Sequence, residues 1–152
     1  MTARPRDLLL ALRMLGWRLI LRLLKRFVPL SRLVPLVCRP RTSETRRFGR
    51  EARVLSLADR LCRGRLARGT CLERSLLSYR FLTEAGADAK LIIAVRREDD
   101  SFQWHAWVTR DGQPVHERAE SLKAYIPVVV FDGQGCVEWS DPTADSPLGV
   151  SI

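Results

Sequence analysis

Apolar and polar positions follow a helical period in the first thirty residues of the chain. Arg13, Arg18 and Arg22 recur about every four residues, a spacing that gathers them along one side of a helix and the leucines along another. The cations interrupt the apolar run well before the roughly 18 residues that a membrane-spanning helix needs. Two interpretations follow. The helix packs its leucine face on its own domain, which we favour, or it lies on an anionic membrane surface or a partner.

A linker separates this helix from the rest of the chain. Pro29, Pro35 and Pro40 interrupt the helical pattern, and residues 39–44 are a polar cluster. We therefore predict a helix with linker over 1–41, a folded domain over 42–140 and a loose C-terminal tail over 141–152. Within the domain, Thr42 or Ser43 is placed to cap a helix that runs to about Arg63 and stops at Gly64.

The next helix is predicted to begin at Cys71. Thr70 is a natural N-cap, Glu73 lies at the spacing of a capping box, and Gly86 supplies a C-terminal stop. The partial positive charge of a helix N-terminus favours a thiolate, which is the nucleophilic form of cysteine. Cys71 is thus a candidate nucleophile and the distant His105 its candidate base. The alternative is a small buried apolar cysteine and a histidine with a structural role.

After Gly86 the apolar pattern changes from helical to extended. Polar or glycine-containing turns separate the apolar runs, as expected for antiparallel strands. Helices followed by such strands predict an α+β fold. The predicted strands cover residues 89–95, 102–109, 114–117, 124–131 and 136–139.

The turn between the second and third strands sets a register. A three-residue loop over 110–112, with Gly112 in the left-handed region, pairs Thr109 with Gln113. His105 then lies beside Glu117 on one face of the hairpin. A two-residue turn made of residues 111 and 112 would instead send Glu117 to the opposite face.

A histidine that acts on a thiol works best when its second ring nitrogen donates to an orienting acceptor. Glu117 is the acceptor that the predicted register supplies, so we predict a catalytic group of Cys71, His105 and Glu117. Asp111 is the rival acceptor, although it lies in the turn and is more simply a turn former.

Composition limits the other chemistry. The 152 residues suit one domain with an N-terminal appendage, and a net charge of +9 predicts acidic partners without identifying them. No motif that reads nucleic acid is present, so a non-catalytic nucleic-acid or membrane-binding module is supported by charge alone. The four cysteines form no C-x-x-C pair, and two histidines complete no familiar zinc spacing. We predict a cytoplasmic protein with reduced thiols, no metal and no cofactor.

Two motifs together resemble a known family. They are Cys-Leu-x-Arg-Ser from Cys71 and His-Ala-Trp-Val-x-x-Asp-Gly from His105. Over about residues 45 to 120 the chain is similar to the leader peptidases of lasso-peptide biosynthesis, in their stand-alone form. The family leads us to expect a proline in the approach to the cysteine, and residues 68–70 contain none. The resemblance also departs at Ala94, at Trp104 and at Glu117, where the family leads us to expect glycine, a small residue and aspartate.

The resemblance implies a transglutaminase-like or papain-like cysteine protease core. It also implies an activity, the removal of the leader from a ribosomally made precursor peptide, with Cys71 attacking the carbonyl, His105 transferring protons and Glu117 orienting His105. The implied partners are the precursor peptide, a separate leader-recognition protein and a macrolactam-forming cyclase. An acyl-enzyme of this kind can also pass its acyl group to an amine, as in a transglutaminase, and the sequence leaves that alternative open.

Overall fold

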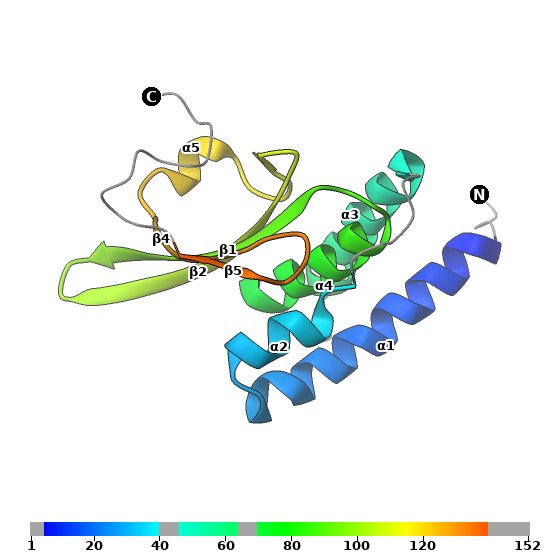
Figure 1. The fold of residues 1–152 in the computed structure, drawn as a ribbon, viewed down its shortest axis with the longest axis horizontal. Helices are drawn as coiled ribbons and strands as arrows, with labels where there is room; N and C mark the ends of the chain where they lie inside the picture. Colours follow the sequence, from blue (N-terminus) through cyan, green and yellow to red (C-terminus); the bar gives the residue numbers. More distant parts are fainter. Residues whose placement is uncertain (1–4, 40–45, 64–69, 140–152) are drawn as a thin grey trace.

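The computed structural model of the chain describes residues 5–39, 46–63 and 70–139 (Figure 1). The helices are α1 (Pro5–Phe27), α2 (Leu30–Val37), α3 (Phe48–Arg63), α4 (Cys71–Glu84) and the short α5 (Ala119–Leu122). The strands are β1 (Ala89–Glu98), β2 (Ser101–Arg110), β3 (Gln113–Pro114), β4 (Ile126–Phe131) and β5 (Val137–Trp139). They form one antiparallel sheet in the order β3-β2-β1-β4-β5, which confirms the α+β prediction.

α4 packs on one face of this sheet, and α1, α2 and α3 pack against α4 on the same side (Figure 1). α4 lies nearest the strands and is buried along almost its whole length, with side chains such as Leu76, Tyr79 and Phe81 in the main core. The other face of the sheet carries a smaller cluster around Ile92, Trp107 and Val130, covered by Leu122 and Tyr125. α4 is therefore the element on which both the sheet and the outer helices are built.

Local sequence determines where α4 begins and ends. The hydroxyl oxygen of Thr70 accepts a hydrogen bond from the backbone N–H of Glu73 at 3.2 Å, as an N-cap should. Gly86 adopts φ +84° just beyond the helix, a conformation that glycine adopts without steric cost. The Glu73 side chain, 2% exposed, bonds to Lys25 of α1 and lies 4.0 Å from Arg22. The predicted N-cap at Thr70 is confirmed, but the Glu73 carboxylate bonds to a cation of α1.

α1 packs on its own domain with a different face from the one predicted. Met14 and Leu21 are fully buried, but most of the other leucines face solvent. Arg13 and Lys25 point toward α4, which offers them acidic partners: Arg13 pairs with Glu84 at 3.0 Å and Lys25 pairs with Glu73. The helix packs on its own domain, as we favoured, but most of the leucine face that was expected to pack there is exposed. Buried apolar side chains and ion pairs with α4 together set the orientation of α1.

The hairpin between β2 and β3 also differs from the prediction. Asp111 and Gly112 both have positive φ, 53° and 77°, so the turn has two residues rather than three. Thr109 accordingly pairs with Pro114 rather than with Gln113. β3 ends at Pro114, and one further bond, from the N–H of Val115 to the carbonyl of Val108 at 3.2 Å, closes the ladder. The predicted strand over 114–117 is thus too long.

Some predictions fall outside the described residues. These are the cap at Thr42 or Ser43, the stop at Gly64 and the loose tail over 141–152, so the division of the chain at 41 and 42 stays a prediction. In the three described ranges, no helix combines the length and the apolar content that crossing a membrane would take.

Candidate active site

Cys71 lies where the start of α4 meets β2. It is half-buried, and the backbone N–H groups of Ala106 and Leu72 hydrogen-bond to its sulfur. One helical turn later, the Ser75 hydroxyl donates to the Ala106 carbonyl at 2.9 Å, which fixes this part of β2 against the helix. The first turn of α4 and residue 106 of β2 therefore hold the thiol from both sides.

His105 precedes Ala106 on β2, and its imidazole forms a hydrogen bond with the Cys71 thiol. That bond is the main cause of a lowered pKa for Cys71, and it outweighs the opposing effect of partial burial. The same bond, helped by Glu117, raises the pKa of His105 to about 9. Both changes favour a thiolate beside an imidazolium at neutral pH, the reactive form of a cysteine nucleophile.

Glu117 reaches the other side of the imidazole. Its Oε1 lies 3.5 Å from Nε2 of His105. The guanidinium of Arg74 donates to the same oxygen. Burial alone would raise the pKa of Glu117, but the bond to His105 and the charges of Arg74 and His105 together lower it. Glu117 is thus held as a carboxylate against the ring.

The contact between His105 and Glu117 arises by a different route from the one predicted. With a two-residue turn, a β3 that continued to residue 117 would place Glu117 on the face opposite His105. The chain instead leaves the sheet after Val115, so its side chains no longer alternate between the two faces. This departure brings Glu117 back to His105. The predicted neighbours meet although the predicted register is wrong.

Asp111, the rival acceptor, is engaged elsewhere. Arg46 binds both of its carboxylate oxygens, at 2.7 and 2.6 Å, and this bond lowers the pKa of Asp111. Asp111 also occupies the turn with positive φ. The structure therefore brings Cys71, His105 and Glu117 together and leaves Asp111 in the turn.

Sequence reasoning missed several residues of this site. Arg74 stands one turn after Cys71, inside the quoted Cys-Leu-x-Arg-Ser motif, so its spacing could have identified it. Tyr125 and Trp107 contact the imidazole, with ring centroids 5.2 and 5.9 Å from that of His105. The Tyr125 hydroxyl donates to Gln103 at 2.7 Å. No local pattern pointed to Tyr125, because it reaches the site from the segment between α5 and β4.

The second histidine has a different neighbour. Nε2 of His116 lies 2.8 Å from the hydroxyl of the fully buried Ser78, and burial is the main cause of a lowered pKa for this imidazole. Within the parts of the chain that the structure describes, no three histidine, cysteine or acidic side chains are grouped as metal ligands would be. The arrangement of the described residues suits acyl transfer through a thiol.

Comparison with known families agrees with this geometry. A family model described as the transglutaminase-like superfamily matches residues 11–130. The chain belongs to this superfamily. Transglutaminase-like domains include cysteine peptidases and acyltransferases, and the matched range contains Cys71, His105 and Glu117. The match also takes in most of α1. No curated protein and no solved structure matches the chain.

Proposed function

We propose that this transglutaminase-like protein is a cysteine peptidase that removes the leader from a lasso-peptide precursor. The observation that supports the chemistry is the Cys71 thiol bonded to His105, with Glu117 at 3.5 Å on the far side of the ring. The substrate class rests on the two sequence motifs that resemble lasso-peptide leader peptidases.

In the proposed reaction, the Cys71 thiolate attacks the carbonyl carbon of the scissile peptide bond. The C–S bond forms as the carbonyl electron pair moves to oxygen, where backbone N–H groups at the start of α4 stabilise the negative charge. The C–N bond then breaks, and the His105 imidazolium gives its proton to the leaving amine. The thioester and the free core peptide are the products of this half.

Water completes the cycle. The oxygen of a water molecule attacks the thioester carbonyl while the now neutral His105 takes a proton from that water. The thiolate leaves when the tetrahedral species collapses. Glu117 stabilises the imidazolium in both halves, and Arg74 holds Glu117 in place. An amine in place of water would give transfer instead of hydrolysis.

The partners follow from the same proposal. A precursor peptide is the substrate, a separate leader-recognition protein presents it, and a cyclase uses the released amine. All four cysteines are free thiols, which agrees with action in the reducing cytoplasm.

The test uses the full chain with the precursor peptide encoded beside its gene and the leader-recognition partner. We expect mass spectrometry to find leader and core whose masses sum to the precursor plus one water. Cys71→Ala should abolish cleavage, whereas Cys136→Ala, which removes an exposed thiol, should leave cleavage intact.

Three results would contradict the proposal. Intact precursor after incubation with the unaltered protein would remove the peptidase function, and cleavage by the Cys71→Ala protein would remove the mechanism. A leader joined to an added amine, without hydrolysis, would identify an acyltransferase.

A further inference from the structure

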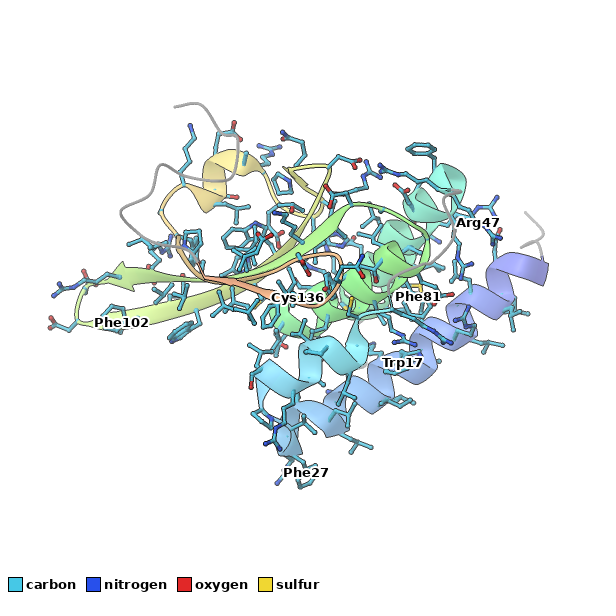
Figure 2. The ribbon with its side chains drawn as sticks, in the orientation of Figure 1. Trp17, Phe27, Arg47, Phe81, Phe102 and Cys136 are labelled. Atoms are coloured by element: carbon cyan, nitrogen blue, oxygen red, sulfur yellow. The ribbon has the colours of Figure 1, made fainter. Side chains whose placement is uncertain are left out.

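One side of α1 presents an almost continuous apolar surface to solvent. Its side chains are 40% to 78% exposed, and we call them the apolar face of α1. They are Leu8, Leu9, Leu12, Leu15, Leu19, Ile20, Leu23 and Phe27. In Figure 2, Phe27 at the end of the helix points away from the domain, whereas Trp17 lies on the inner side. Exposed apolar surface of this extent marks a site of association.

Among the residues that the structure describes, none covers this face. Met14 and Leu21 on the opposite side are fully buried, and the guanidinium of Arg80 stacks on the Trp17 ring at 3.5 Å. Arg13 and Lys25 are bonded to Glu84 and Glu73 of α4. Turning the apolar face inward would break these ion pairs and leave the Glu73 carboxylate buried without a cation.

Charge indicates which partner fits the apolar face. α1 contains six cations, Arg6, Arg13, Arg18, Arg22, Lys25 and Arg26, and a single acidic residue, Asp7. Asp7 is already paired with Arg53 at 2.8 Å. Arg26 is exposed near the C-terminal end of the apolar face, and Arg32 of α2 is exposed beyond it. An anionic surface complements this arrangement.

The shape of the face distinguishes lipid from protein. The exposed leucines lie along a single side of a 23-residue helix, which is about 35 Å long at the usual rise. A long apolar side flanked by arginines is typical of helices that lie in the plane of a membrane interface. Because the inner side is bonded to α4, such a helix would be held parallel to the membrane by its own domain.

We propose that α1 is a peripheral membrane-binding element that places its apolar face among the acyl chains of an anionic bilayer. Arg26 and Arg32 would lie at the level of the lipid phosphates. This assignment does not depend on the peptidase proposal, because it needs neither Cys71 nor a substrate.

Sedimentation of the full chain with vesicles tests it. One set of vesicles is pure phosphatidylcholine, and in the other about a third of the lipid is phosphatidylglycerol. We expect binding to the anionic vesicles, reduced by salt, and much weaker binding to the neutral ones.

Variants assign the binding to the apolar face. The triple variant Leu12→Ser/Leu19→Ser/Leu23→Ser should lower the bound fraction about tenfold or more, since each buried leucine contributes to membrane affinity. Phe48→Ser, which removes an equally exposed apolar side chain from α3, is the matched control and should bind as the unaltered protein does. Arg26→Gln/Arg32→Gln should weaken binding to anionic vesicles only.

Circular dichroism and the alkylation rate of Cys71 verify that each variant is folded. Failure of the unaltered protein to bind anionic vesicles would overturn the proposal. Equal binding by the triple-serine variant would also overturn it. Self-association in sedimentation velocity that the triple variant abolishes, without vesicle binding, would identify a second copy of the chain as the partner instead.

Discussion

α4 and α1 depart in opposite ways from the usual arrangement of a helix with a polar outer side and an apolar inner side. α4 buries polar side chains along its length, and α1 exposes apolar ones. Each buried polar side chain of α4 has a partner: Lys25 for Glu73, the Ala106 carbonyl for Ser75, His116 for Ser78, the Val37 carbonyl for Arg80, and the Tyr79 and Arg80 carbonyls for Thr83.

The comparison shows what sets the orientation of a helix in this fold. Buried polar groups need partners at fixed distances, so those of α4 hold neighbouring elements in defined positions. The exposed leucines of α1 impose no such condition on the domain. Buried apolar side chains of α1 and its ion pairs with α4 orient the helix, and its outer apolar side remains available for association.

The largest effect is expected at the N-terminal end of α4, beside the candidate active site. His105→Gln should lower kcat/KM for precursor cleavage about 1,000-fold or more, because the thiol loses its proton-transfer partner. His116→Gln, which changes the other histidine, is the matched control and should cost less than about tenfold. Similar losses in both variants would contradict the assignment of His105 as the base.

Substitutions on the two sides of α1 should differ in their effect on the free energy of unfolding. Met14→Ala removes a fully buried side chain and should lower the free energy of unfolding by about 2 to 5 kcal/mol. Leu12→Ala, only two residues away but 58% exposed, should change it by less than about 0.5 kcal/mol. Urea denaturation measures both values. Equal losses would show that the apolar face is covered within the protein.

Arg74 should affect the rate of cleavage by orienting Glu117. Arg74→Gln removes the donor to Glu117 Oε1, and we expect kcat to fall roughly 10- to 100-fold with KM little changed, as for a residue that orients a catalytic group. Arg74→Lys should restore part of the loss. A change confined to KM would place Arg74 in substrate binding instead.

The His105 pKa of about 9 sets an upper limit on the pH range of activity. Cleavage needs the imidazolium as the acid, so activity should fall roughly tenfold per pH unit above that value. Because this pKa is raised above its ordinary value of 6.5, the stability that it contributes is complete below pH 6.5 and is lost as the pH rises through about 9. Rate profiles and urea denaturation across this range measure the two effects.

The lower limit of that range follows from the lowered pKa of Cys71. In a Cys136→Ser background, which removes the exposed thiol, alkylation of Cys71 by iodoacetamide should already be fast at neutral pH. Burial raises the pKa of Cys38 and Cys62, so these thiols should react slowly. A Cys71 rate that rises only in alkali, as for an ordinary thiol, would contradict the thiolate.

The smallest effect is expected for the ion pair between Lys25 of α1 and Glu73 of α4. Lys25→Met removes the cation bonded to Glu73, but Arg22 remains 4.0 Å away and compensates in part. We expect a loss of about 1 kcal/mol in the free energy of unfolding. Lys25→Arg, which keeps the charge, is the control. An unchanged stability would mean that Glu73 finds other partners.

The sequence predicted the parts of the fold that depend on neighbouring residues. Thr70 and Gly86 marked both ends of α4, and the apolar runs located β1 and β2 to within a few residues. The contact of His105 with Glu117 was predicted through a register that the structure corrects. Apolar alternation cannot show where a strand stops pairing, and here β3 stops at Pro114.

Such patterns could not predict contacts between segments that are far apart in the sequence. The helical period separated the leucines of α1 from its arginines, but it does not say which side faces the domain. That choice depends in part on Glu73 and Glu84, far along the chain on α4. Tyr125 reaches His105 in the same way: the apolar pattern predicted a strand over 124–131, but it did not show that this residue meets the imidazole.

The ion pairs at the two ends of α4 bear on how the protein can be engineered. Glu73 lies in the first turn of the helix and is paired with Lys25 of α1, whereas Glu84, its last residue, is paired both with Arg13 of α1 and with Arg50 of α3. A gene shortened to begin after the linker would encode a chain in which Glu73 loses Lys25, while Glu84 keeps Arg50. A more soluble variant is therefore better sought by replacing the exposed leucines of α1 than by deleting the helix.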